Sequence, residues 1–157
     1  MNNVQTLEPY LAEHPFLKGM EKRHIELLVG CASNVRFEAG QYIFREGDEA
    51  NEFYFIRHGK MALEIFRPHK GGIVVQTIKP GDVVGWAWLF PPHLRHFDCR
   101  AIELTRAIAL DGTCLRNKCE QDHELGYEIM RRFAALMEDE LLALRLQLLD
   151  IYGVQQT

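Results

Sequence analysis

The chain has 157 residues, of which 47% are hydrophobic and 25% are charged, and its formal net charge is -4. This length and composition are typical of one globular domain. The acidic balance and the lack of any run of Lys or Arg argue against direct nucleic-acid binding, because phosphate contacts need a clustered basic face.

The N-terminus has no basic segment followed by an apolar one, and no apolar run in the chain is long enough to cross a bilayer. We therefore expect neither a secretion signal nor a membrane span. The four cysteines, Cys31, Cys99, Cys114 and Cys119, show no CxxC pair, which zinc and iron-sulfur sites usually need. The sequence predicts a cytoplasmic protein with reduced thiols, no disulfide and no metal.

Apolar residues at helical spacing occupy the N-terminal segment. Leu7 and Leu11 share one helical face, and a second apolar patch lies at 25–29. The breaks at His14-Pro15 and Lys18-Gly19 separate these patches. The spacing predicts two short helices within about 7–30.

From about 32 to 111, short apolar runs alternate with glycine-containing turns. The predicted strands are Tyr42–Phe44, Phe53–Ile56, Met61–Phe66, Ile73–Ile78, Asp98–Glu103 and Arg106–Leu110. Strands this short at this spacing favour a barrel or jelly roll, since a doubly wound sheet would have helices between them. Gly71-Gly72 is the predicted turn of a hairpin.

The C-terminal part, about 113–152, is predicted to be helical. Asp111 can cap a helix that begins near Cys114, and a long helical segment follows over 122–152. Two sets of apolar residues recur in a heptad: Tyr127, Ala134, Leu141 and Leu148, and Met130, Met137, Leu144 and Ile151. A second apolar flank holds Ile129, Phe133, Leu136, Leu142, Leu146 and Leu149.

About four heptads are enough to indicate a coiled coil. We expect the heptad seam to pair with a second copy of the chain and the second flank to pack on the strands of its own chain. A single broad face buried within one chain is the alternative.

The stretch 85–101 has features of an anion site. Gly85 lets the chain turn sharply out of a Val-Val strand, and residues 86–89 allow one helical turn before Pro91-Pro92 ends it. The start of such a turn presents free backbone N–H groups, which favour an anion, and Arg95 can direct its guanidinium to the same place. Trp88 favours a core position, whereas Trp86 fits equally a core plug and the wall of a pocket.

Several motifs of glycines and hydrophobic residues recur at a characteristic spacing: Phe37-x-x-Gly40-x-x-Ile43, Glu46-Gly47-Asp48, Phe53-Tyr54-Phe55-Ile56-x-x-Gly59, Pro80-Gly81-Asp82, Val84-Gly85 and Arg95 six residues before Ala101. With these motifs the sequence resembles the cyclic nucleotide-binding domain of Crp/Fnr-type regulators over nearly all its length. The resemblance implies a single domain over 1–157 of the α+β, mainly β class. Its fold would be an eight-stranded, jelly-roll-like β-roll with short N-terminal helices and a long C-terminal dimerisation helix.

The resemblance also implies a ligand site. Arg95 matches the family's phosphate-binding arginine, but Trp86 stands where the family has a glutamate that accepts the ribose hydroxyl, and an indole offers no acceptor. The family's purine-contacting hydroxyl residues fall at Leu144 and Arg145. The predicted ligand-binding residues are Gly85, Trp86, Ala87, Trp88, Arg95, His96, Leu144 and Arg145.

We expect a stand-alone sensor without enzymatic activity, which binds a cyclic nucleotide or another small anion and signals through its dimer helix to a separate effector protein. No DNA-binding domain is expected, because only a few residues follow the long helix. A ligand-free dimeric scaffold is the alternative. A metal at His93, His96 and Asp98 is disfavoured by Arg95 between them, and a cupin-type metalloenzyme would need a His-x-His pair that the chain lacks.

Overall fold

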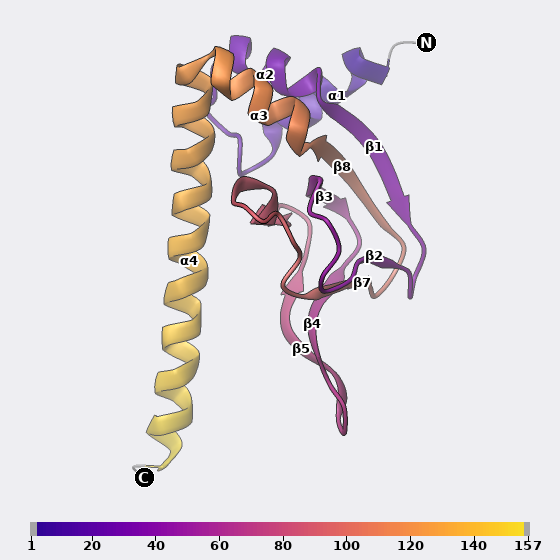
Figure 1. Ribbon diagram of the computed structural model, residues 1–157, viewed down its shortest axis with the longest axis vertical. Helices are drawn as coiled ribbons and strands as arrows, with labels where there is room; N and C mark the ends of the chain where they lie inside the picture. The colour runs from indigo at the N-terminus through magenta and orange to yellow at the C-terminus, as the bar shows by residue number, and fades with distance from the viewer. Residues whose placement is uncertain (1–2, 156–157) are drawn as a thin grey trace.

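Two four-stranded antiparallel sheets lie at the centre of the computed structural model, which describes residues 3–155 (Figure 1). The first sheet has the order β1 (Ala32–Phe37), β8 (Thr105–Asp111), β3 (Glu52–His58) and β6 (Val83–Val84). The second has the order β2 (Tyr42–Phe44), β7 (Asp98–Ala101), β4 (Met61–Arg67) and β5 (Gly71–Ile78). The predicted eight-stranded roll is thereby confirmed. β6 corresponds to the Val-Val strand predicted before Gly85, whereas β1 was not among the predicted strands.

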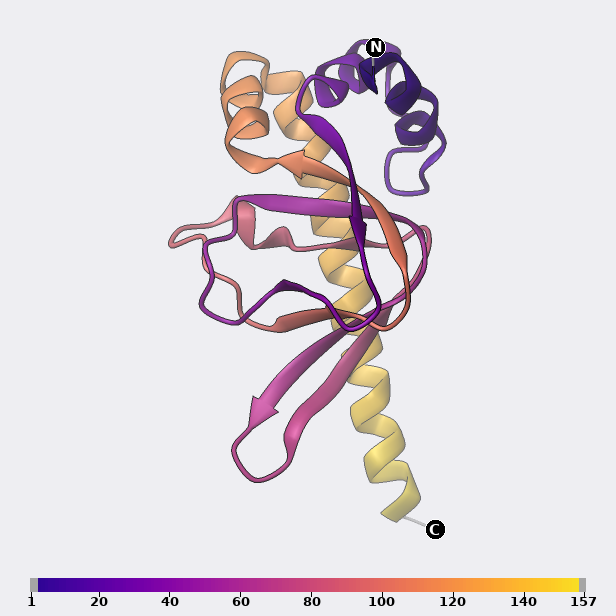
Figure 2. The same ribbon diagram turned by 90° about the vertical axis from the view of Figure 1, so that its right-hand side faces the viewer.

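The helices lie at one end and along one side of the sheets. α1 (Asn3–Glu13) and α2 (Lys22–Val29) confirm the two predicted N-terminal helices. α3 (Gly112–Gln121) begins after Asp111, whose carboxylate accepts a hydrogen bond from the backbone N–H of Cys114 at 3.0 Å, as the capping pattern predicts. α4 (His123–Gln155) runs down the side of the roll (Figure 2). No helix within residues 3–155 has the length and apolar character needed to cross a membrane.

The β4–β5 hairpin differs in detail from the prediction. Its turn is formed by residues 68–70, and Gly71 and Gly72 already pair with Arg67 and Phe66 in the sheet. Gly71 has a φ of +71°, so it supplies the left-handed conformation that a three-residue hairpin loop needs at its end. The predicted Gly-Gly turn is therefore wrong by a few residues, while the hairpin is correct.

An aromatic core joins the first sheet, the η1 turn (Trp86–Leu89) and α4. The Phe53 ring stacks on Trp88 with centroids 4.9 Å apart and meets the edge of Phe133 at 5.2 Å. All three side chains are buried. A second cluster, which includes Ile56, Met61 and Cys99, fills the space between the sheets. The core position predicted for Trp88 is thus confirmed.

α4 packs on the roll only along its first half. Ile129 and Phe133 are fully buried, but Leu142, Leu146 and Leu149 on the same flank are 54%, 52% and 65% exposed. The expectation that this whole flank packs on the strands is wrong for its C-terminal half. The physical reason is that the helix is longer than the surface it covers, so its end runs free of the sheets (Figures 1 and 2).

A disulfide joins Cys31, in the short segment between α2 and β1, to Cys114 in the first turn of α3, with Cα atoms 5.7 Å apart. The expectation that all four thiols are reduced is therefore wrong for this pair. The two residues are 83 positions apart in the sequence, so no local spacing signals their contact. Cys99 is buried and free, as expected of a core residue, and burial raises the pKa of its thiol to about 12.

We expect Phe133→Ala to lower the free energy of unfolding by about 3–5 kcal/mol, because it empties the contact between α4 and the aromatic core. Denaturant unfolding measures this loss. Glu138→Ala, an exposed position on the same helix, is the control and should change stability by less than about 0.5 kcal/mol. Equal effects of the two substitutions would contradict the packing described for α4.

Cys114→Ser is expected to lower the free energy of unfolding by about 2–4 kcal/mol under non-reducing conditions, because it frees the loop that the disulfide closes. Cys119→Ser, at a half-buried thiol without a disulfide, is the matched control. Alkylation of the unfolded, unreduced protein followed by mass spectrometry should modify two thiols. Modification of all four would show that the disulfide is absent.

Candidate functional site

The turn between β6 and η1 brings the backbone close to Arg95. Gly85 ends β6 with a φ of +97°, and a Cβ at this position would lie 2.7 Å from Arg95 Nη1. Glycine is therefore required for two reasons, the left-handed backbone and the close approach of the guanidinium. The predicted single helical turn over 86–89 is present as η1.

Arg95 is a buried cation that has no carboxylate partner within residues 3–155. Its side chain is 5% exposed, with Nη1 donating to the Gly85 carbonyl at 3.3 Å and Nη2 to the Glu52 carbonyl at 2.5 Å. The guanidinium carbon lies 4.1 Å above the Phe44 ring, and Nε is buried without a hydrogen-bond partner among residues 3–155. Burial lowers the pKa of Arg95, but a guanidinium stays protonated at neutral pH. A charge in this position favours an anion beside it.

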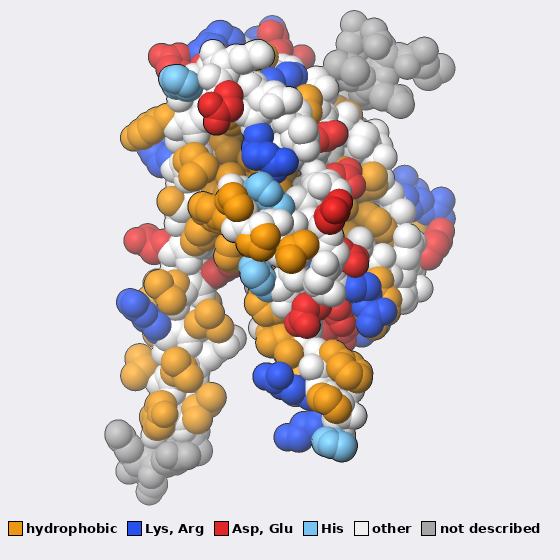
Figure 3. Space-filling view, in the orientation of Figure 1, with side chains coloured by type: hydrophobic (Ala, Val, Ile, Leu, Met, Phe, Trp, Pro, Cys, Tyr) orange, Lys and Arg blue, Asp and Glu red, His pale blue; other side chains and the backbone are white. Residues whose placement is uncertain are grey.

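A cavity of about 670 Å³ opens beside Arg95, between the roll and α4. Its apolar wall comes from β4, β5 and β6 on one side and from Leu136, Ala143 and Leu144 of α4 on the other. Figure 3 shows the hollow that separates the C-terminal half of α4 from the β4–β5 hairpin. The predicted ligand residues that line the cavity are Gly85, Trp86, Ala87, Arg95, His96 and Leu144.

Trp86 forms part of the cavity wall. Its side chain is half-buried, and its Nε1–H donates to Glu140 Oε2 on α4 at 3.3 Å. Glu140 also accepts a hydrogen bond from the Gln76 side chain, and desolvation raises the pKa of its carboxyl above the ordinary value. Trp86 thus lines the cavity and also packs against the edge of the hydrophobic core, so both interpretations of this residue apply.

Two predicted ligand residues do not line the cavity. Trp88 is 1% exposed and belongs to the aromatic core with Phe53. Arg145 is exposed on α4, next to Leu144, which does line the cavity. Trp88 and Arg145 therefore lie outside the cavity lining, whereas Leu144 lies in it.

The acidic groups of the cavity were missed from the sequence. Asp82 lies in the Pro80-Gly81-Asp82 motif between β5 and β6, while Asp139 and Glu140 lie on α4. The lining residues of α4 form two adjacent rows, Leu136, Glu140 and Leu144 in one and Asp139, Ala143 and Gln147 in the other, each with a spacing of four residues. Of these lining residues, only Leu144 was predicted, from the resemblance. The helical spacing of Asp139 and Glu140 relative to Leu144 is the one signal in the sequence that could have identified the two acidic residues.

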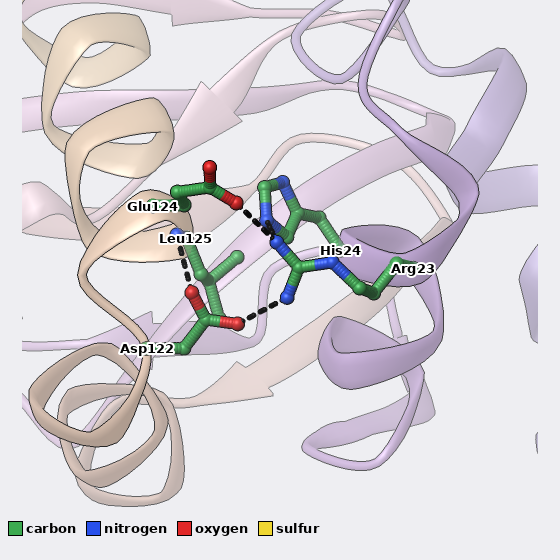
Figure 4. A network of polar contacts seen from close by, with 5 residues as sticks. All are labelled: Arg23, His24, Asp122, Glu124 and Leu125. Atoms are coloured by element: carbon green, nitrogen blue, oxygen red, sulfur yellow. Dashed lines mark hydrogen bonds and ion pairs between the residues drawn. The ribbon is translucent and has the colours of Figure 1, made fainter.

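A second polar cluster joins α2 to the start of α4 (Figure 4). Arg23 pairs with Asp122 and donates to Glu124 Oε2 at 2.5 Å, and its Nη2 lies 2.8 Å from His24 Nε2. Asp122 also accepts from the backbone N–H of Leu125, which lowers the pKa of its carboxyl together with Arg23. The cluster therefore fastens the N-terminal helices to α4.

Possible metal ligands converge at one place within residues 3–155. Potential ligand atoms of Glu21, His24 and Glu124 lie within 4.8 Å of one another, but the guanidinium of Arg23 contacts both His24 and Glu124 there. A cation at that place would meet the positive charge of Arg23, so the cluster is best described as an ion-pair network. Asp98, considered above as a ligand with the histidines, accepts from the backbone of Glu46 at 2.8 Å.

The family model of the cyclic nucleotide-binding domain matches residues 34–122. The chain is 25% identical over 128 residues to a CRP-like cAMP-activated global transcriptional regulator of Mycobacterium tuberculosis; the alignment covers 82% of this chain and 57% of the regulator. The chain therefore corresponds to little more than half the length of that curated relative.

Solved structures show the same fold. A cyclic nucleotide-binding domain from Methylobacillus flagellatus superposes with a TM-score of 0.77 at 16% identity, over 87% of this chain and 81% of that one. The regulatory subunit of a cAMP-independent protein kinase A from Trypanosoma brucei gives 0.70 at 21% identity, over 89% of this chain and 52% of that one. From the matched segment and the shared roll, we conclude that the chain belongs to the cyclic nucleotide-binding domain family.

Proposed function

We propose that this chain is a ligand-sensing module without enzymatic activity, which binds a small organic anion beside Arg95 and passes the signal through α4. The observation that carries the proposal is the buried Arg95 guanidinium, which borders a cavity of about 670 Å³ and has no carboxylate partner within residues 3–155. A bound anion would neutralise this charge and accept from its free Nε.

A scaffold that binds no ligand explains this site less well. Such a protein would keep a buried cation that has no carboxylate partner within residues 3–155 next to an open cavity, which costs stability. An apolar side chain at position 95 could pack on Phe44 without that cost. The unpaired charge therefore supports the sensing proposal over the scaffold.

The route of the signal in this proposal runs from the cavity to α4. Gly85, Trp86 and Arg95 belong to the stretch 85–101, which we call the cassette, and Gly85 lies beside Arg95. Trp86 is hydrogen-bonded to Glu140 on α4 at 3.3 Å. A ligand that moves the η1 turn would therefore shift α4 or break this bond. A ligand that contacts both η1 and α4 would bind more tightly to one position of α4 than to another. This difference in affinity would couple ligand binding to the position of the helix.

In this proposal, α4 carries the signal by pairing with a second copy, and the pair acts on a separate effector protein. The heptad residues Leu141, Leu144, Leu148 and Ile151 are 49–58% exposed and form an apolar stripe along the free half of the helix. Such a stripe gains from burial against an identical one, at roughly 25 cal/mol per Å² of apolar surface.

Cyclic AMP serves as an anionic probe of the site. Its affinity for the full chain, measured by isothermal titration calorimetry, should fall at least about tenfold in Arg95→Gln, because the variant lacks the charged donor of one hydrogen bond to the phosphate. Arg106→Gln, which removes the same charge from an exposed position on β8, should leave the affinity unchanged. Equal affinity of both variants for the probe would contradict the anion site.

The proposed dimer is tested by sedimentation of the wild-type protein and of variants with lysine substitutions on either of the two exposed apolar flanks of α4. Sedimentation of the purified protein should give a mass about twice 18.2 kDa. The double substitution Leu141→Lys and Leu148→Lys should give monomers, because it places charges in the heptad seam. Leu142→Lys with Leu149→Lys, on the other exposed flank, is the matched control and should remain dimeric. A monomeric wild type, or dissociation by the control substitutions alone, would overturn the heptad pairing.

A further inference from the structure

Charges of both signs border the cavity and are not paired with each other. Arg95 lies on the cassette side, and Glu140 reaches the cavity from α4. Within residues 3–155, neither side chain takes part in an ion pair. Each charge is therefore satisfied only by neutral groups, although both are removed from bulk water.

Glu140 has acceptor capacity left for a ligand. Its partners are the Trp86 Nε1–H and the Gln76 side chain, both neutral donors. A carboxylate offers about four acceptor positions, so two of them are used. Desolvation, the largest effect on its pKa, disfavours the ionised form, and a cationic donor from a ligand would reverse this.

Much of the remaining cavity wall is apolar. Phe44, Ile78 and Val84 face Leu136 and Leu144 across the cavity. Gln76, Asp82, His96, Asp139 and Gln147 add further polar groups to the lining. An apolar ligand body gains from burial against the apolar face, at roughly 25 cal/mol per Å² of apolar surface. The body of a fitting ligand is therefore apolar.

We propose that the ligand of this cavity is a zwitterionic amphiphile, with an anionic group at Arg95, an apolar body and an ammonium-type donor at Glu140. This inference rests on the proposed function, since it assumes that the cavity holds a small anion. It adds that Glu140 determines which ligands bind, because this residue lies on α4, the helix that carries the signal in the proposed function. A ligand of this class would bridge the cassette and α4 directly.

A pair of matched probes tests the inference on the full chain. Isothermal titration calorimetry compares 8-aminooctanoic acid with octanoic acid, which has the same carboxylate and chain but lacks the amine. The amino compound is expected to bind at least about tenfold more tightly, which corresponds to one charge-assisted hydrogen bond. In Glu140→Gln this preference should disappear, while the affinity for octanoic acid stays the same.

Two controls separate the site from general charge effects and from misfolding. Glu140→Gln keeps an acceptor for the Trp86 indole, so the wall should remain in place, and an unchanged melting temperature would confirm this. Glu138→Gln removes the same charge from an exposed position of α4 outside the cavity and should retain the full preference.

The outcomes distinguish the inference from the proposed function. If both compounds bind in an Arg95-dependent manner with equal affinity, the zwitterion inference is overturned and the anion site stands. A preference that persists in Glu140→Gln likewise overturns it. If neither compound binds, or if Arg95→Gln binds both as well as the wild type does, the anion site itself is wrong and the inference falls with it.

Discussion

The site depends on one buried charge, the Arg95 guanidinium. Its Nη groups donate to the carbonyls of Glu52 and Gly85, so the side chain holds the start of β3 and the cassette turn together. Gly85 is required because any side chain there would collide with Nη1. The position of the turn, of Trp86 and of the cavity follows from this arrangement. We propose that a bound anion completes the hydrogen bonding of this guanidinium.

α4 has two different physical roles along its length. Its first half completes the aromatic core through Phe133, while its second half leaves the roll and exposes apolar residues on both flanks. Between these halves lies Glu140, bonded to Trp86. The helix is thus anchored at one end, free at the other and in contact with the cavity where the two meet. The Arg23 cluster joins α2 to the N-terminal end of α4, and the Cys31–Cys114 disulfide links the segment after α2 to the preceding helix α3.

The sequence predicted the features that depend on local patterns. Glycine turns indicated most strands, and Gly85 with the following prolines indicated the single turn of η1. It did not predict strand β1, which has no continuous apolar run, or the disulfide between residues 83 positions apart. Glu140 was missed because its role depends on a contact with Trp86, 54 residues away. Trp86 itself was ambiguous, since an amphipathic indole suits a core and a pocket wall equally.

Native mass spectrometry of the protein purified from its own host tests the central claim most directly, because it measures the mass of the assembly and of any small molecule it retains. The account predicts a dimer that carries a small organic anion, and the loss of that anion in Arg95→Gln purified in the same way. A wild-type protein with no added mass, or the same retained molecule in the variant, would contradict it.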